Sequence, residues 1–215
     1  MQLVFEQIRA GGDRNFGYVL GDRPSQQAVL IDPSYAPELF VERAGEQGLR
    51  VTLIINTHGH ADHTSGNRRA VELTGARIAG HPDLASGRPL ADGETLAIGV
   101  LRLRVLHVPG HAPDHIVLYE ETHRILMTGD LLFVGKVGGT TTDDEARTEW
   151  HSLRRLVDAI PDEATVWPGH DYGVRPSSTM GLEKQTNPFL LCPDLTAFLQ
   201  LKANWASFKK EYGLK

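Results

Sequence analysis

Three histidines and an aspartate stand within seven consecutive positions, in the string Thr57-His-Gly-His-Ala-Asp-His63. The apolar run Val51–Ile55 comes directly before this string, so a buried strand is expected to end where the string begins. Imidazole and carboxylate groups at one point suit zinc or iron, and the string contains no thiolate. A solvated polar loop is the alternative, but the string is internal and follows a strand, so we interpret it as part of a metal site.

Three further segments each place a possible ligand just after an apolar run. They are Val108-Pro-Gly-His111, Met127-Thr-Gly-Asp130 and Trp167-Pro-Gly-His170. Glycine lets the backbone turn sharply, so the side chain that follows is expected to point off the strand end. The combined set has seven members: His58, His60, Asp62, His63, His111, Asp130 and His170. Seven ligands are too many for one four-coordinate zinc, and they suffice for two adjacent metals that share a carboxylate and a bridging water.

Short β-rich runs and a few helical segments must position these residues. Strands are expected at residues 3–8, 16–20, 28–31, 51–55, 77–79, 95–98, 101–108, 116–119, 124–127 and 165–167, with 131–134 continuing the hairpin before it. Helices are expected over residues 37–47, 65–73, 143–160 and 194–212. This order predicts one α+β domain, residues 1–215, in which mixed sheets form a sandwich covered by helices. Residues 171–215 are expected to add a loop and a closing helix.

The composition excludes several classes of protein. The chain has 215 residues and a formal net charge of −5, whereas a nucleic-acid binder usually shows a basic face. Cys192 is the only cysteine, so neither an intramolecular disulfide nor a thiolate metal cage is expected. The N-terminus has no secretion signal, and no apolar stretch approaches the ~20 residues that span a bilayer. We therefore expect a soluble, cytoplasmic protein with no nucleic-acid or membrane partner, whose oligomeric state the sequence leaves open.

The ordered motifs resemble those of the metallo-β-lactamase superfamily. The resemblance rests on Thr57-His-Gly-His-Ala-Asp-His63 followed by His111, Asp130 and His170, and it covers nearly the whole chain. It implies a four-layer αββα sandwich, with mixed sheets inside, helices on the outer faces and metals in a groove at one edge. It also implies a role for Asp32, since members of the family commonly use a strand-end aspartate to support the metal-binding loop.

The resemblance implies a distribution of the ligands over two metals. The first metal would be held by His58, His60 and His111, and the second by Asp62, His63 and His170, with Asp130 bridging the two. Zinc is the expected metal, with iron or manganese as alternatives, because sites of this ligand type bind any of the three.

The C-terminal motifs are similar to those of two branches of the superfamily. Pro168-Gly-His-Asp-Tyr172 and Thr186-Asn-Pro-Phe-Leu190 resemble glyoxalase II-type enzymes, the hydroxyacylglutathione hydrolases. The same region resembles the glutathione persulfide dioxygenases, which hold a single iron by two histidines and an aspartate. Here those ligands would be His58, His111 and Asp130. The string His-Ala-Asp-His is common in the dioxygenase branch, whereas Asn-Pro-Phe-Leu favours the hydrolase branch.

The substrate residues depart from both branches. In glyoxalase II a basic residue that helps to bind glutathione follows the bridging aspartate, but here Gly139 stands at that place and Lys136 lies three positions earlier. The dioxygenase pattern Gly-Arg-Thr-Asp is absent there as well. Tyr172 matches a tyrosine that contacts glutathione in the family, so Tyr172 and Lys136 are the candidate substrate-binding residues. Of the two, Tyr172 alone favours a small substrate such as a glutathione or other thiol conjugate.

Four functions remain open at this point. The first is a hydrolase of thioesters in which two metals convert a bridging water into hydroxide, and Asp62 orients that nucleophile or relays its proton. The second is the mononuclear iron persulfide dioxygenase, and the third is a lactonase or other hydrolase of small esters. The fourth is a metal-bound binding or sensing protein without catalysis, which an undegraded ligand set disfavours. Among the other histidines, His115 could line the site, but a structural or surface role is favoured for it.

Overall fold

Two six-stranded mixed sheets form the centre of the protein in the computed structural model, which describes residues 2–81 and 87–212. The first sheet has the order β1-β2-β3-β4-β5-β6, antiparallel from β1 to β3 and parallel from β3 to β6. Its strands are β1 (Leu3–Gly11), β2 (Asn15–Asp22), β3 (Gln27–Ile31), β4 (Arg50–Ile55), β5 (Arg77–Gly80) and β6 (Arg88–Pro89).

The second sheet has the order β14-β13-β10-β9-β8-β7, and only the β10–β13 pair in it is parallel. Its strands are β7 (Thr95–Ile98), β8 (Leu101–His107), β9 (Ile116–Glu120), β10 (Ile125–Gly129), β13 (Thr165–Pro168) and β14 (Ser178–Thr179). A separate two-stranded ribbon joins β11 (Leu132–Phe133) to β12 (Lys136–Val137).

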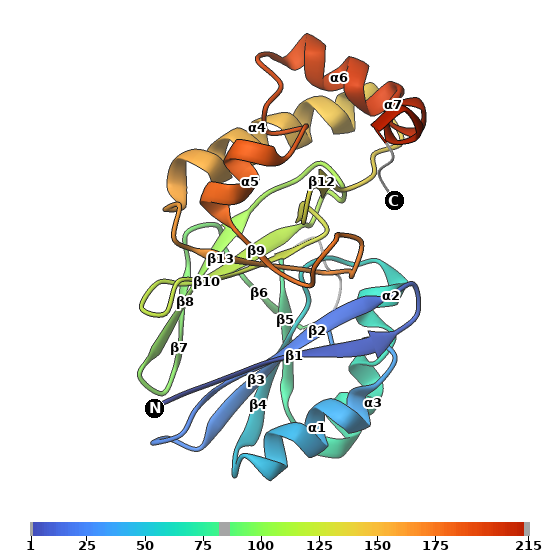
Figure 1. Cartoon of the computed structure of the whole chain (residues 1–215). Coiled ribbons are helices and arrows are strands. Elements are labelled where there is room, and N and C mark those ends of the chain that lie inside the picture. Colours follow the sequence, from blue (N-terminus) through green and yellow to red (C-terminus); the bar gives the residue numbers. More distant parts are fainter. Residues whose placement is uncertain (1, 82–86, 213–215) are drawn as a thin grey trace.

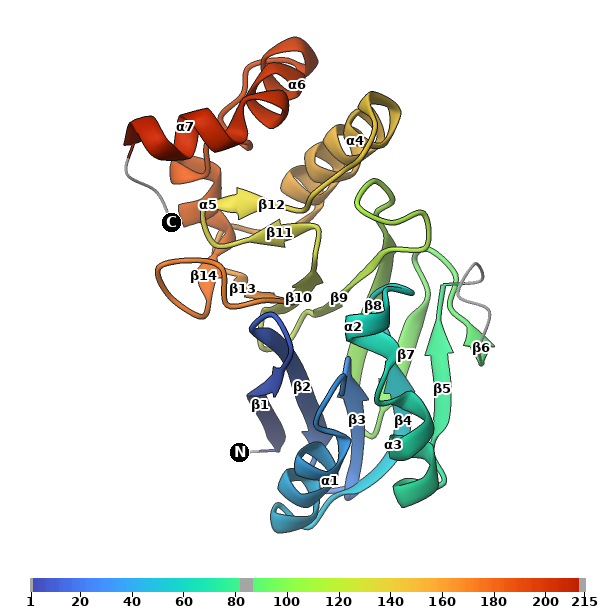
Figure 2. The ribbon, with the colours of Figure 1, turned by 90° about the vertical axis from the view of Figure 1, so that its right-hand side faces the viewer.

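Helices cover the outer face of each sheet, so the molecule has four layers (Figure 1). On the first sheet lie α1 (Pro37–Glu46), α2 (Ala61–Thr64) and α3 (Asn67–Thr74). On the second lie α4 (Asp143–Ala159), α5 (Met180–Thr186), α6 (Leu195–Ala203) and α7 (Trp205–Tyr212). Figure 2 shows the two helical layers on opposite sides of the paired sheets. The αββα sandwich that the resemblance implied is therefore confirmed.

Three apolar cores correspond to the three interfaces between these layers. One lies between the sheets, one packs α1 and α3 on the first sheet, and one packs α4 and α6 on the second. The apolar residues of strand β4 serve two of these cores, since Leu53 and Ile55 enter the core between the sheets while Val51 and Ile54 face the helices. A strand buried on both faces needs apolar side chains at consecutive positions, not at alternate ones.

The ends of five strands meet at one edge of the sandwich. Strands β3 and β4 are parallel neighbours, so Asp32 lies beside the start of the string at Thr57. Strands β10 and β13 are also parallel, and Gly129 is paired with Pro168, which brings Asp130 next to His170. Two antiparallel pairings separate β8 from β10, so the two strands run in the same direction and end at the same edge.

Three expected elements differ from the observed ones. Residues 131–134 do not extend β10, because Gly129 adopts a φ of +48° and turns the chain, so that Leu132 pairs with Val137 instead. The helix expected over residues 194–212 is divided at Asn204, and this break lets both Phe198 and Trp205 contact Phe189. The helix expected over residues 65–73 is α3, which begins at residue 67 and ends at residue 74, and the C-terminal segment contains α5 as well.

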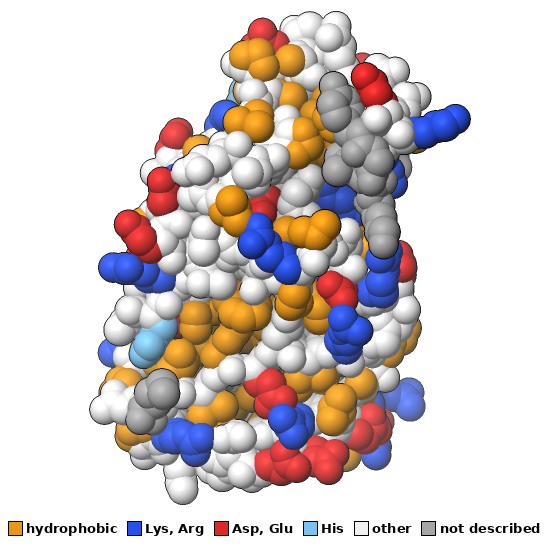
Figure 3. Space-filling view, viewed as in Figure 1, with side chains coloured by type: hydrophobic (Ala, Val, Ile, Leu, Met, Phe, Trp, Pro, Cys, Tyr) orange, Lys and Arg blue, Asp and Glu red, His pale blue; other side chains and the backbone are white. Residues whose placement is uncertain are grey.

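The surface carries charges of both signs. Figure 3 shows acidic and basic side chains intermixed on one face, with a band of hydrophobic side chains across its middle. Within residues 2–81 and 87–212, no helix combines the length and the apolar character needed to cross a membrane.

Candidate metal centre

The seven potential ligands from the sequence come together at the edge where the strands end. Ligand atoms of His58, His60 and His111 all lie within 4.8 Å of one another, and so do those of Asp62, His63 and His170. Asp130 lies between these two groups: its Oδ2 is 3.6 Å from Nε2 of His111 and 3.2 Å from Nε2 of His170. The geometry brings together both triples that the resemblance implied, with a carboxylate that reaches both, and Asp130 also forms a group with His58 and His63.

Each of four imidazoles has one ring nitrogen held by the protein and the other directed into the centre. The Nδ1 of His111 lies 2.7 Å from the carbonyl oxygen of Gly139, and the Nδ1 of His170 lies 2.8 Å from that of Asp13. A carbonyl oxygen only accepts hydrogen bonds, so Nδ1 must carry a proton, and in the neutral ring Nε2 is the nitrogen with the lone pair. A metal ligand requires that lone pair, and the bond at Nδ1 fixes the tautomer that directs it into the centre.

Asp32 sets the tautomer of the other two buried histidines. Its Oδ2 lies 3.0 Å from Nδ1 of His63 and accepts the hydroxyl of Thr57 at 2.7 Å. Since the Thr57 hydroxyl donates to Asp32, its oxygen is free to accept from Nδ1 of His58 at 3.1 Å. Both rings thus direct Nε2 into the centre. This geometry agrees with the supporting role expected for Asp32, whose φ of +47° is one that aspartate and asparagine adopt more readily than most residues.

Asp62 is held by the turn between β1 and β2. Asn15 donates its side-chain amide to the Asp62 carboxylate at 3.0 Å and to the Asp62 carbonyl at 3.2 Å, and Ser34 donates to the same carbonyl. The Asp62 side chain is 33% exposed, whereas that of Asp130 is 9% exposed. Asp62 is thus the carboxylate of the centre that solvent reaches most easily.

The carboxylates of the centre favour positive charge on the groups beside them. Burial alone would lower the pKa of His63, but the carboxylates of Asp32 and Asp130 hold it well above its usual range. The hydrogen bonds of Asp130 and Asp62 likewise outweigh burial and raise the pKa of His170 to about 9. The buried carboxylates thus favour positive charge at this point, which a bound metal would supply.

The donor set also fits a metal. Nε2 of His63 and Oδ1 of Asp130 are buried without a hydrogen-bond partner in the described part of the chain, and they face each other at 3.4 Å. Oxygen and imidazole nitrogen donors that converge in this way suit zinc, iron or manganese.

His115, for which the sequence favoured a structural or surface role, lies directly beside the potential ligands. It is fully buried, its ring stacks on that of His58 with centroids 4.9 Å apart, and its Nε2 accepts the backbone N–H of Asp130 at 2.9 Å. The structural role favoured for it is thus correct, and that role lies directly behind two ligands. Asp13 and Asn15 were not identified, because a turn residue that reaches a distant ligand leaves no local signal.

The two candidate substrate residues lie together at the mouth of the centre. The ring of Tyr172 stacks on that of His170 at 4.6 Å, and its hydroxyl donates to the Asp13 carboxylate at 2.6 Å. The Lys136 ammonium lies 3.9 Å from the centre of the Tyr172 ring, and the Arg14 guanidinium lies 4.7 Å from it. Lys136 and Arg14 thus both lie close to the Tyr172 ring, which in turn lies against the potential ligand His170.

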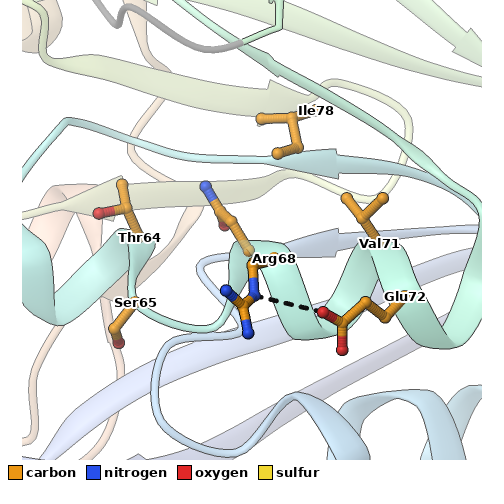
Figure 4. A pocket seen from close by; sticks show the side chains of 7 residues that line it. Thr64, Ser65, Arg68, Val71, Glu72 and Ile78 are labelled. Atoms are coloured by element: carbon orange, nitrogen blue, oxygen red, sulfur yellow. Dashed lines mark ion pairs between the residues drawn. The ribbon is translucent and has the colours of Figure 1, made fainter.

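A surface cavity of about 600 Å³ lies elsewhere, between α3 and β5. Its lining includes Thr64, Arg68, Glu72 and Ile78 but none of the seven potential ligands (Figure 4). Arg68 and Glu72 are paired with each other at 3.2 Å. This cavity is therefore separate from the candidate metal centre.

Comparison with known proteins agrees with this geometry. A family model described as the metallo-beta-lactamase superfamily matches residues 11–89 and 82–170. The mitochondrial persulfide dioxygenase ETHE1 of Homo sapiens is 33% identical over 196 residues, which cover 88% of this chain and 75% of that protein. A hydroxyacylglutathione hydrolase of Polaromonas sp. is 30% identical over 178 residues, covering 79% of this chain and 67% of that one. The crystal structure of ETHE1 from Myxococcus xanthus superposes with a TM-score of 0.86 at 30% identity, covering 94% and 91% of the two chains.

Proposed function

The chain belongs to the metallo-β-lactamase superfamily, and on that premise we propose that it is a thioester hydrolase that uses two divalent metals. The observation that carries the proposal is the intact second triple. Asp62, His63 and His170 are each held by a neighbour that leaves their ligand atoms directed into the centre. A second metal is needed for this chemistry but not for a site that holds one iron.

The proposed reaction adds water to a thioester carbonyl and releases a carboxylic acid and a thiol. When bound, two divalent metals would supply Lewis acidity and lower the pKa of a water molecule toward neutrality. His58, His60 and His111 would hold the first metal, and Asp62, His63 and His170 the second, with Asp130 in contact with both. Zinc is the metal proposed, with iron or manganese as alternatives.

Asp62 is proposed as the residue that moves a proton. Asn15 fixes its Oδ2 at 3.0 Å, and its partial exposure gives it access to solvent. The hydrogen bond from His170 is the main reason why the pKa of Asp62 lies below its usual range, so the carboxylate is ionised at neutral pH. It can therefore orient a water molecule and pass its proton outward.

Lys136 and Tyr172 are proposed as substrate-binding residues. The Tyr172 hydroxyl is engaged with Asp13 and its ring lies against His170, Lys136 and Arg14, so Tyr172 would contribute chiefly by holding these two cations in place. Lys136 and Arg14 add two positive charges beside that ring. This arrangement favours a substrate with a carboxylate, such as a glutathione or similar thiol conjugate.

A persulfide dioxygenase is the second candidate, and the similarity to the ETHE1 proteins of Homo sapiens and Myxococcus xanthus favours it. In that function His58, His111 and Asp130 would hold one iron and leave positions for oxygen and substrate.

Metal analysis combined with two assays separates the candidates. The protein purified from its native host should contain two metals per chain and hydrolyse a hydroxyacylglutathione thioester, with simple esters and lactones as comparison substrates. One iron per chain with oxygen uptake on glutathione persulfide would replace the hydrolase with the dioxygenase. Turnover of esters or lactones without thioesters would assign the site to a different hydrolase.

A further inference from the structure

Three polar side chains from the C-terminal helices and the residue that caps α5, two of them buried, end on the backbone of one short segment. Glu183 accepts from the amide of Gly135 at 2.9 Å, Asn187 donates to the carbonyl of Lys136 at 3.2 Å, and Lys202 donates to the carbonyl of Gly138 at 2.9 Å. This segment, residues 135–139, ends at Gly139, whose carbonyl accepts from Nδ1 of His111. The C-terminal helices therefore hold the backbone beside a metal ligand.

Lys202 is the most unusual of the three because it carries a charge into the interior. Its side chain is 12% exposed and reaches from α6 to Glu149 of α4, which is fully buried. Burial raises the pKa of Glu149 to about 7, and the neighbouring ammonium of Lys202 opposes that rise. A buried ion pair seldom adds stability over apolar side chains of similar size, so its position calls for another explanation.

The two glycines at the end of this segment, Gly138 and Gly139, have no side chains to fix them. A Cβ at Gly138 would lie 2.1 Å from the carbonyl oxygen of Asp130, so this residue must be glycine. A Cβ at Gly139 would meet nothing within 4 Å, so no neighbouring atom packs closely there. Two consecutive glycines are conformationally free, and their carbonyls are directed only by the groups that bond to them.

Helix α4 supports the other side of the same ligand. The glycine before His111, Gly110, packs directly against the backbone of Glu149, and Ser152 donates to the carbonyl of Pro109 at 2.7 Å. The Glu149–Lys202 pair thus lies between the loop that carries His111 and the carbonyl that fixes its ring.

We propose that Lys202 is a positioning residue for the metal centre. By holding the Gly138 carbonyl while paired with Glu149, it keeps the Gly139 carbonyl where it accepts the Nδ1–H of His111. The ring then presents Nε2 to the first metal. The inference rests on the assignment of His111 as a metal ligand in the proposed function.

The test replaces Lys202 and compares it with a lysine of the same kind. K202M removes the ammonium and keeps most of the stem. K184M is the matched control, because Lys184 of α5 also donates to a carbonyl, that of Ile160 at 3.1 Å, and to a carboxylate, that of Asp162 at 2.7 Å. K202M/E149M removes both buried charges and still lacks the bond to Gly138, so it covers the case in which an unpaired Glu149 prevents folding.

Two readouts report position without any substrate. The ¹⁵N chemical shifts of His111 in the metal-free protein give its tautomer, and competition with a chromophoric chelator gives the affinity for cobalt. In K202M and in the double variant, His111 should show a mixture of tautomers and the tightest cobalt site should weaken about tenfold. K184M should retain the wild-type tautomer and affinity.

Wild-type values in both K202M variants would overturn the proposal. Equal changes in K184M would also overturn it, because loss of helix docking alone would then explain the result. Since neither readout uses thioester turnover, an inactive but correctly loaded wild-type protein would contradict the proposed function and leave this inference intact.

Discussion

Replacing Asp32 with asparagine tests the hydrogen bonds that direct the ligands. Asp32 is 2% exposed and acts only as an acceptor: Oδ1 accepts from the amide of Thr57 at 2.9 Å, and Oδ2 faces the Thr57 hydroxyl and Nδ1 of His63. Asparagine has the same shape and tolerates the φ of +47°, so D32N changes the hydrogen-bonding groups without straining the backbone.

The amide of D32N has one favourable orientation. Its oxygen must face the Thr57 amide, because that N–H cannot turn away, and its NH₂ group then faces the hydroxyl and His63. The Thr57 hydroxyl is able to rotate and accept, whereas Nδ1 of His63 must lose its proton to accept. The proton then moves to Nε2, the atom directed at the second metal. His58 is less affected, because the Thr57 oxygen is still free to accept from it.

The expected loss follows from these contacts. Changing a group that orients a ligand costs about 10- to 100-fold in metal affinity, which corresponds to about 1.4–2.8 kcal/mol. We expect that loss at the second metal and a change of no more than a few-fold at the first. The free energy of unfolding of the metal-free protein should fall by about 1.5–3 kcal/mol, the range for a hydrogen bond to a charged group.

Stepwise competition titration with a chelator measures both affinities, and chemical denaturation measures the stability. D22N is the matched control: Asp22 is fully buried and accepts from the amides of Ser25 at 3.1 Å and Val100 at 3.4 Å, far from the metal centre. It should lose stability and bind both metals normally. Two wild-type affinities in D32N, or a loss confined to the first metal, would refute the assignment of Asp32 as the group that sets the His63 tautomer.

Three further changes test other parts of the centre. The carboxylates around His170 raise its pKa to about 9, so below that pH a metal must displace a proton from the ring. Metal affinity should therefore rise with pH up to about 9. Calorimetry in buffers of different ionisation enthalpy would count the protons released. G129A should lower the melting temperature and the metal content together, because its Cβ would lie 2.8 Å from Nε2 of His115. G135A is the control: its φ is also positive, but its Cβ would meet nothing within 4 Å, so it should affect stability alone. K136M should raise KM for an anionic thioester by about tenfold, as expected for loss of ~1.4 kcal/mol of binding, and should change kcat much less; an unchanged KM would remove Lys136 from the substrate site.

The convergence of the seven potential ligands could be predicted because each segment that carries them follows a strand. Residues after parallel strands of one sheet must meet at one edge, so the strand that precedes Asp130 and the strand that precedes His170 sufficed to bring the two together. The triples were expected from the resemblance alone, and the observed distances within them agree with that expectation.

The groups that orient the ligands could not be predicted in the same way. Asn15 and Asp62 are 47 positions apart, and His170 is bonded to a backbone carbonyl, a partner that every residue offers. The division of the final helix depends likewise on Phe189, a residue outside it. Periodicity predicts the buried face of a helix but not the position of the partner that bends the chain around it.

The orienting groups also bear on the number of metals. A site for one iron would need His58, His111 and Asp130 and would leave Nε2 of His63 without a metal. Leaving a buried polar atom unsatisfied is costly, and Nε2 of His63 has no hydrogen-bond partner among the described residues. The second metal of the proposed hydrolase would satisfy that nitrogen. If the proposal is correct, D32N should shift the number of metals per chain from two toward one.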